Sequence, residues 1–294
     1  MRRPFRWSAG LVFAFLACLP FGAMAERLVP SAGMDSPVLA AELARYRLVA
    51  GTCRFESDPA RQDNGHPGSV VRPDINYLLF RPRIARTRLP VVVFLPGLGE
   101  LGDDLSLQFH QRTIFEVVTS PAFQRRHPCY LLVAVMPRGA DWHCRHAGCT
   151  TPVLSALAGT IATVMRGERA PGADPDRTYL TGLSAGGGAA GALVAACPGC
   201  FAAAVSVANT PPPSLFPSNA ANLYVVLNQG EERRTAAHVD FDAFAARLAA
   251  QGGDFRLGTL TGHGHNAWDE AWREDALWDW MFSKALPTRT SAGR

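Results

Sequence analysis

The chain has 294 residues, of which 48% are hydrophobic and 18% are charged, and its formal net charge is +4. This length and apolar content favour one large folded domain and exclude a chain that is disordered throughout. Three of the 29 lysines and arginines, and none of the acidic residues, lie in the first 25 positions. The remainder is close to neutral and has no basic run of the kind that binds nucleic acid.

Residues 1–25 have the layout of a secretory signal peptide. Three arginines within the first six residues precede an apolar run over 11–19, which is too short to span a bilayer. Ala23 and Ala25 then form a small-x-small cleavage site. We therefore expect cleavage after Ala25, export to the periplasm or the medium, and no stable membrane anchor. Lipoprotein processing at Cys18 is the alternative.

From residue 26 to 286 the hydrophobic pattern alternates between strands and helices. Apolar runs predict strands over 75–81, 90–96, 130–136, 178–181, 201–208, 223–227 and 255–260. Helical patterns cover 37–47, 103–119, 152–166, 239–250 and 268–284, and an alanine-rich helix follows residue 186. Segments 54–73 and 137–151 read as loops, and 287–294 as a flexible tail. The alternation predicts a single α/β domain, a mostly parallel central sheet with helices on both faces.

Gly182-Leu183-Ser184-Ala185-Gly186 stands between a predicted strand and a predicted helix. Strand, G-x-S-x-G and helix in succession are typical of a nucleophile elbow, a sharp turn that exposes the serine hydroxyl. Glycine suits positions 182 and 186 because side chains there would collide with the neighbouring strand and helix. The motif alone is common by chance, and an ordinary glycine-rich turn is the competing interpretation.

Two further strand ends carry the partners that a serine nucleophile needs. His265 follows strand 255–260, and the pair Glu231 and Glu232 follows strand 223–227. A histidine must accept the proton of Ser184, and a carboxylate must orient and stabilise that histidine. Serine, acid and histidine in this order are typical of α/β-hydrolases.

The sequence leaves some choice within this triad. We expect His265 to be the base, with His263 as the alternative, because the last predicted helix starts just after His265. We expect Glu232 to be the acid. Glu231 and Asp240 remain open, since adjacent glutamates point in different directions.

A glycine-containing turn, Pro96-Gly97-Leu98-Gly99, directly follows strand 90–96. The backbone N–H of Leu98, together with that of Ala185 after the nucleophile, would form an oxyanion hole. A plain glycine turn is the competing interpretation.

The turn Pro96–Gly99, the elbow around Ser184 and the segment GHNAWDEAW around His265 resemble the corresponding parts of secreted α/β-hydrolases. The resemblance covers residues 75–282. The group most similar is the bacterial esterases and peptidases related to polyhydroxybutyrate depolymerases and feruloyl esterases. The resemblance implies an α/β-hydrolase fold with Ser184 as nucleophile and His265 as base. Two features depart from the family: Pro96 stands where it has histidine, and Glu231-Glu232 stand where it has an aspartate loop.

The expected activity is therefore hydrolysis of a small or polymeric carboxylic ester by a serine hydrolase without cofactor or metal. A serine peptidase and a catalytically silent binding module are the alternatives. The sequence determines neither the substrate nor the oligomeric state.

Six cysteines follow the leader, an even number that suggests disulfides in an exported protein. Cys144 and Cys149 bracket a short loop, and Cys197 and Cys200 have a spacing that allows local pairing. By elimination Cys53 would pair with Cys129, although the sequence does not determine this. The Cys197–Cys200 spacing also occurs in zinc and redox sites.

Overall fold

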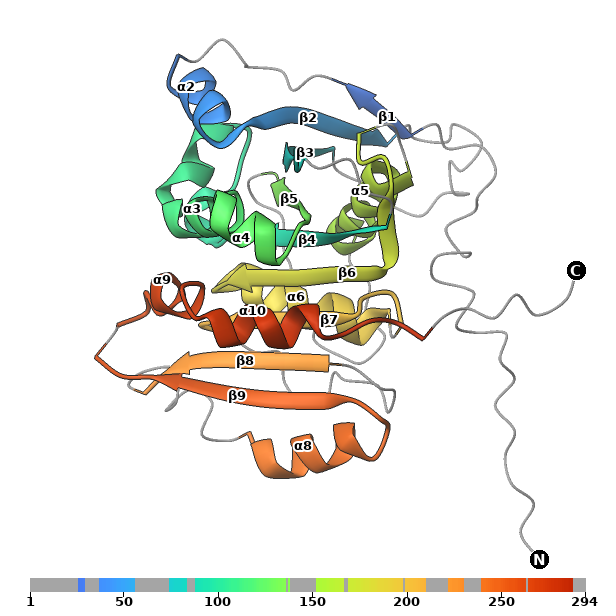
Figure 1. Cartoon of the computed structure of the whole chain (residues 1–294), viewed down its shortest axis with the longest axis vertical. Coiled ribbons are helices and arrows are strands. Elements are labelled where there is room, and N and C mark those ends of the chain that lie inside the picture. The colour runs from blue at the N-terminus through green and yellow to red at the C-terminus, as the bar shows by residue number, and fades with distance from the viewer. Residues whose placement is uncertain are drawn as a thin grey trace, which may run out of the picture.

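The computed structural model describes residues 26–29, 37–55, 74–83, 88–135, 137, 152–166, 169–197, 199–209, 222–229, 239–262 and 264–287. Its strands are β1 (Glu26–Val29), β2 (Leu48–Phe55), β3 (Ile75–Phe80), β4 (Leu89–Leu95), β5 (Tyr130–Val135), β6 (Ala173–Leu183), β7 (Ala203–Val207), β8 (Asn222–Asn228) and β9 (Asp254–Leu260). They form one nine-stranded sheet in the order β1-β2-β3-β5-β4-β6-β7-β8-β9, which Figure 1 shows from β1 and β2 at the top to β9 at the bottom.

The sheet is parallel from β5 to β9 and antiparallel from β1 to β3 and at the β3–β5 pairing. Every residue of β4 and β5 is buried, as expected for parallel strands covered on both faces. Alternate residues of β4 join different cores: Val91 and Val93 pack in one, and Val92 and Phe94 in the other. A mostly parallel sheet between two cores is the predicted α/β architecture, and it is confirmed.

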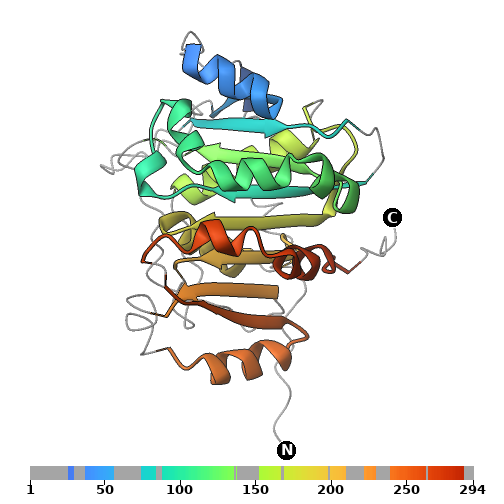
Figure 2. The same cartoon turned by 60° about the vertical axis from the view of Figure 1, so that its left-hand side comes forward.

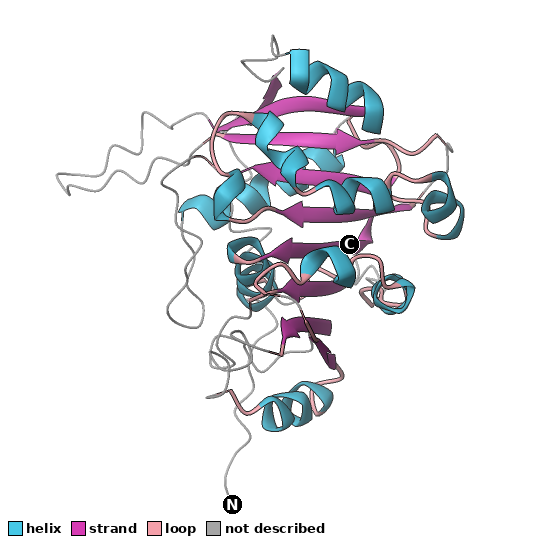
Figure 3. Cartoon of the chain, turned by 90° about the vertical axis from the view of Figure 1, so that its left-hand side faces the viewer, coloured by secondary structure: helices cyan, strands magenta, loops and turns pink. Residues whose placement is uncertain are grey.

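Helices cover both faces of this sheet (Figure 3). One core includes side chains of α5 (Pro152–Arg166), α6 (Ala185–Ala196) and α8 (Phe241–Ala249). The other includes side chains of α2 (Pro37–Tyr46), η3 (Leu105–His110), α3 (Arg112–Val118), α4 (Pro121–Arg126), α9 (Trp268–Ala271) and α10 (Asp275–Phe282). Figure 2 shows α2 and α8 at opposite edges of the sheet, where they contact β2 and β9 respectively.

Two predicted helices are each divided in the structure. The expected helix 103–119 is the 3-10 helix η3 followed by α3, and the break falls at Gln111, whose backbone is non-helical at φ −92° and ψ 57°. The expected helix 268–284 is α9 followed by α10, and it breaks at Glu274, which has an extended backbone. In both cases the apolar periodicity continues across the break, so the sequence pattern gave no sign of it.

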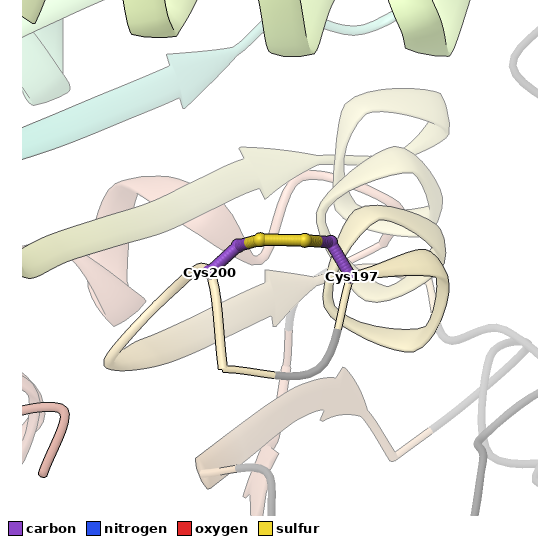
Figure 4. The surroundings of a disulfide bond; sticks show 2 residues. All are labelled: Cys197 and Cys200. Atoms are coloured by element: carbon purple, nitrogen blue, oxygen red, sulfur yellow. A yellow bond between two sulfur atoms is a disulfide. The ribbon is translucent and has the colours of Figure 1, made fainter. Parts of the chain in front are cut away.

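The Cys197–Cys200 disulfide joins the end of α6 to the turn that precedes β7 (Figure 4). The pairing of Cys53 with Cys129 by elimination is wrong. Both residues are buried, but they lie in different cores on opposite faces of the sheet and form no disulfide with each other. Cys144 and Cys149 lie outside the described residues.

The last helix is attached to the edge of the sheet through Asp254 at the start of β9. Its Oδ2 accepts hydrogen bonds from Nζ of Lys284 and from Nε1 of Trp280, both at 2.7 Å. Burial disfavours the charge of Asp254, but these two bonds outweigh the effect and hold the pKa of the carboxyl below its usual range.

Two further observations concern the described residues only. No helix among them is both long enough and apolar enough to cross a membrane. The same residues contain no group of three or more histidine, cysteine, aspartate and glutamate side chains that could bind a metal ion.

Candidate active site

Ser184 stands at the sharp turn between β6 and α6. β6 ends at Leu183, α6 begins at Ala185, and Ser184 between them has φ 51° and ψ −120°. A positive φ is unfavourable for a residue with a side chain and persists only where the surroundings enforce it. Here the Ser184 N–H donates to the carbonyl of Val207 in the neighbouring strand at 2.8 Å. This geometry is that of a nucleophile elbow.

The two glycines of the motif occupy positions that exclude a side chain. A Cβ added at Gly182 would lie 2.4 Å from the carbonyl oxygen of Gly186 and 2.8 Å from that of Leu95. A Cβ at Gly186 would lie 2.0 Å from the oxygen of Leu95 and 2.4 Å from that of Pro96. The first turn of α6 is therefore packed directly against the end of β4, where the segment Gly97–Leu98 begins.

His265 comes to Ser184 from a loop 81 residues further along the chain. Its Nε2 lies 2.9 Å from Oγ of Ser184, the distance of a hydrogen bond. Both residues follow parallel strands, on the side of the sheet where the carboxyl ends of these strands lie. Figure 1 shows the arrowheads of β6, β8 and β9 on this side, with α9 beside them. Ser184 is half-buried and His265 is exposed, so the pair is accessible to a substrate.

Two residues outside the predicted triad contact the histidine loop, and of these only Trp268 belongs to a segment that the sequence singles out. The indole of Trp268 meets the His265 ring edge-on, with ring centres 5.5 Å apart. Asn228, buried at the end of β8, donates from Nδ2 to the carbonyl of Gly264. The available signal for Asn228 was a polar residue directly after the apolar run 223–227.

The structure describes one of the three candidate acids. Glu231, Glu232 and the alternative base His263 lie outside the described residues. Asp240 is described, and it caps α8: its Oδ1 accepts the N–H of Ala243 at 2.9 Å. That bond satisfies a free donor at the start of the helix, which accounts for an aspartate at this position without a catalytic role.

Both expected oxyanion donors occupy the first position of a helix. Leu98 begins η2 (Leu98–Glu100) and Ala185 begins α6. The first N–H groups of a helix have no acceptor within that helix. The contact of Gly186 with Leu95 and Pro96 places these two helix starts next to each other. The structure thus combines a hydroxyl and an imidazole that contacts it with two neighbouring helix starts.

Comparison with known proteins identifies the fold. No protein-family model and no curated protein matches the chain. Among solved structures, a thermostable esterase superimposes with a TM-score of 0.62 and 23% identity over 81% of this chain and 63% of that one. The protein has the α/β-hydrolase fold. A proposed dipeptidyl aminopeptidase IV from Bacteroides ovatus also matches, with a TM-score of 0.51 and 13% identity over 81% of this chain and 36% of that one.

The chain spans less than two thirds of the length of either neighbour. At these identities the likeness establishes the α/β-hydrolase fold and nothing about the substrate. Esterases and peptidases share this fold, so the chemistry has to be inferred from the residues of the site.

Proposed function

We propose that the protein is an exported serine hydrolase that cleaves carboxylic esters. The observation that carries this proposal is the 2.9 Å contact between Nε2 of His265 and Oγ of Ser184 at the nucleophile elbow. The same contact favours a working enzyme over a catalytically silent scaffold, because a binding module has no need of an imidazole on a strained serine. Export rests on the layout of residues 1–25 alone.

In the proposed reaction, Oγ of Ser184 attacks the ester carbonyl while Nε2 of His265 takes the hydroxyl proton. The oxyanion that forms accepts hydrogen bonds from the N–H groups of Leu98 and Ala185. Each such donor contributes about 10²- to 10³-fold in kcat. His265 then returns the proton to the departing alcohol, which leaves an acyl group on Ser184. Water, deprotonated by His265, releases the carboxylic acid and restores the serine. Glu232 is the proposed partner of the imidazolium.

The nucleophile is tested by Ser184→Ala, with Ser283→Ala as the matched control. Ser283 lies at the end of α10, where its Oγ donates a hydrogen bond to the carbonyl of Trp280 at 2.7 Å. We expect Ser184→Ala to abolish both ester turnover and labelling by a fluorophosphonate probe while keeping the circular dichroism spectrum. Ser283→Ala should keep both activities. Ester hydrolysis by Ser184→Ala at the wild-type rate would end the proposal.

The acid is tested by comparing Glu231→Gln, Glu232→Gln and Asp240→Asn in turnover of a small activated ester. In serine proteases the corresponding change lowers kcat about 10⁴-fold, since an amide neither stabilises imidazolium nor holds its tautomer. We expect a loss of that order for Glu232→Gln alone. Asp240→Asn should keep turnover and nearly all of its stability, because the described role of Asp240 is to cap a helix and asparagine caps helices about as well as aspartate. A collapse at Glu231→Gln instead would move the assignment by one residue.

Preference for esters over peptides is tested with parallel panels of aryl esters and peptide amides. We expect kcat/KM to be higher on the esters. Faster cleavage of the amides would identify a peptidase that uses the same residues.

A further inference from the structure

Two hydrogen-bonded clusters flank the Ser184–His265 pair, and both end on the same short segment at the start of α3. We infer that Gln111 and Thr113, here called the α3 anchor, fix the oxyanion turn and the histidine loop relative to each other. Glu100 and Asp269 connect the anchor to the two sides. This inference rests on the proposed function, and it assigns positioning residues, not groups that touch the substrate.

On the oxyanion side, the connection is the buried carboxylate of Glu100, which is 6% exposed. Its Oε1 accepts a hydrogen bond from Nε2 of Gln111 at 2.9 Å. Its backbone carbonyl accepts from Nε2 of the fully buried Gln108. Its Oε2 lies against Gly97, where an added Cβ would come within 3.0 Å of it. Glu100 thus supports the turn that presents the Leu98 N–H and ties that turn to the anchor.

Burying a carboxylate is costly unless hydrogen bonds compensate it. Oε2 of Glu100 has no such partner within the described part of the chain. An apolar residue would cost less here, so stability alone does not explain a glutamate at this position. Fixing the Gly97–Leu98 turn does explain it, because the side chain reaches Gly97 on one side and Gln111 on the other.

On the histidine side, the connection is Asp269 in the first turn of α9. Its Oδ1 accepts a hydrogen bond from Oγ1 of Thr113, which is 3% exposed. Its Oδ2 accepts from Nδ2 of Asn266 at 3.3 Å, and Asn266 directly follows His265. Arg273 donates to Oγ1 of Thr113 at 3.2 Å and to the carbonyl of Asp269 at 3.0 Å. These bonds hold the His265 loop against α3.

The two clusters meet within three residues of one element. A shift of the anchor would therefore change the distance between the Leu98 N–H and the imidazole of His265, which act on the same tetrahedral intermediate. A misplacement of about 1 Å in a catalytic constellation costs on the order of 10²-fold in rate. Substrate affinity would change little, because neither Glu100 nor Thr113 belongs to the groups proposed to contact the substrate.

The first experiment compares Thr113→Val with Thr160→Val. Thr160 is the matched control: it is also a buried threonine, and its hydroxyl donates to the carbonyl of Ala156 within α5 at 2.9 Å. Both variants should lose stability. We expect Thr113→Val alone to lower kcat on an activated ester, by about 10- to 100-fold, with KM within about twofold of wild type. Thr113→Ser, which keeps the hydroxyl, should restore kcat.

Equal kcat losses in Thr113→Val and Thr160→Val, or an unchanged kcat in Thr113→Val, would overturn the inference. If Thr113→Val does not fold, Asp269→Asn serves in its place. The amide of that variant still accepts from Thr113 but no longer accepts from Asn266, and the same kcat loss at constant KM is expected.

A double-mutant cycle on Glu100→Leu and Asp269→Asn tests whether the anchor is shared. If either change already uncouples the two loops, the kcat of the double variant should be little lower than that of the single variant with the lower kcat. Independent local effects would instead multiply to within about twofold, and that result would refute a common anchor. Ser184→Ala is measured alongside. If it is inactive while the effects multiply, only the anchor fails and the serine hydrolase stands.

Discussion

For the substitution Gly186→Ala, intrinsic helix propensity and the packing of the elbow predict changes in stability of opposite sign. Gly186 lies in the first turn of α6, where alanine should stabilise the helix by about 1 kcal/mol relative to glycine. The structure predicts destabilisation, because the new Cβ would lie 2.0 Å from the carbonyl oxygen of Leu95 and 2.4 Å from that of Pro96.

The expected size follows from what would have to move. Overpacking usually costs about 1–3 kcal/mol when neighbouring side chains can yield. At Gly186 the obstructing atoms are backbone atoms of Leu95, at the end of the central strand β4, and of Pro96, so we take the upper end of that range. Subtracting the gain of about 1 kcal/mol in helix propensity leaves a net loss of about 2 kcal/mol. For a domain of this size, that loss lowers Tm by about 4–8 °C.

Activity should fall as well. Relieving the clash moves the end of β4 away from α6 by about 1 Å, and with it the turn that carries the Leu98 N–H. We expect kcat of the folded variant to drop on the order of 10²-fold. Gly99→Ala is the control, because an added Cβ at Gly99 in the same turn meets no atom within 4 Å. It should change Tm and kcat little.

The assays are thermal denaturation followed by circular dichroism and steady-state hydrolysis of an activated ester at a temperature where all variants are folded. If Gly186→Ala raises Tm, or keeps wild-type kcat, the close approach of α6 to β4 is wrong as described. Equal effects of Gly186→Ala and Gly99→Ala would show that the loss of glycine itself, and not the collision, is responsible.

Three further outcomes follow from single groups. Asp254 has a lowered pKa in the folded state. Its ionised form therefore stabilises the protein at pH values above the pKa of about 4 that aspartate has in the unfolded chain. This stability is lost as the pH falls through the pKa of Asp254 in the folded protein. The Tm difference between wild type and Asp254→Asn should therefore be full near pH 6 and vanish in strong acid; a constant difference would contradict the role of Asp254 as acceptor for Lys284. Burial raises the pKa of the Cys129 thiol to about 12, so iodoacetamide should modify Cys129 only after unfolding, as peptide mapping would show. Asn228→Leu removes the donor to the carbonyl of Gly264, the residue before His265, so kcat should fall while KM stays at the wild-type value. An unchanged kcat would mean that the loop does not need this bond.

The elements that the sequence predicted well are those with a strong local pattern. β4 and β5 are continuous apolar runs, and such runs identify buried parallel strands without tertiary information. The elbow was also readable, because glycines at 182 and 186 and a serine between them meet a strict steric requirement that few other residues satisfy. The approach of Ser184 to His265 followed from a general rule, that parallel strands place their carboxyl ends at one edge.

The remaining features depend on contacts that leave no periodic trace. The antiparallel extension was missed because β2 mixes apolar residues with Thr52 and Arg54, and its pairing with β3 becomes visible only in three dimensions. The positioning role of Glu100 was equally hidden, since a glutamate in a glycine-rich turn gives no indication that it is buried. The same holds for Cys53, whose distance from Cys129 depends on which face of the sheet each occupies.

The late position of α9 and α10 in the chain has a consequence for how the protein is made. The indole of Trp272 meets the ring of Phe94 edge-on and donates to Oγ1 of Thr181 at 3.2 Å, and the carbonyl of Lys284 accepts from the hydroxyl of Tyr179 at 2.8 Å. The central strands β4 and β6 therefore acquire part of their cover from residues that the ribosome adds after position 267. A nascent chain that ends earlier leaves apolar groups of these strands exposed and also lacks His265. Covering of the sheet and assembly of the Ser184–His265 pair are thus both postponed until these later residues have been synthesised, and during that interval the chain presents a partly uncovered sheet to chaperones.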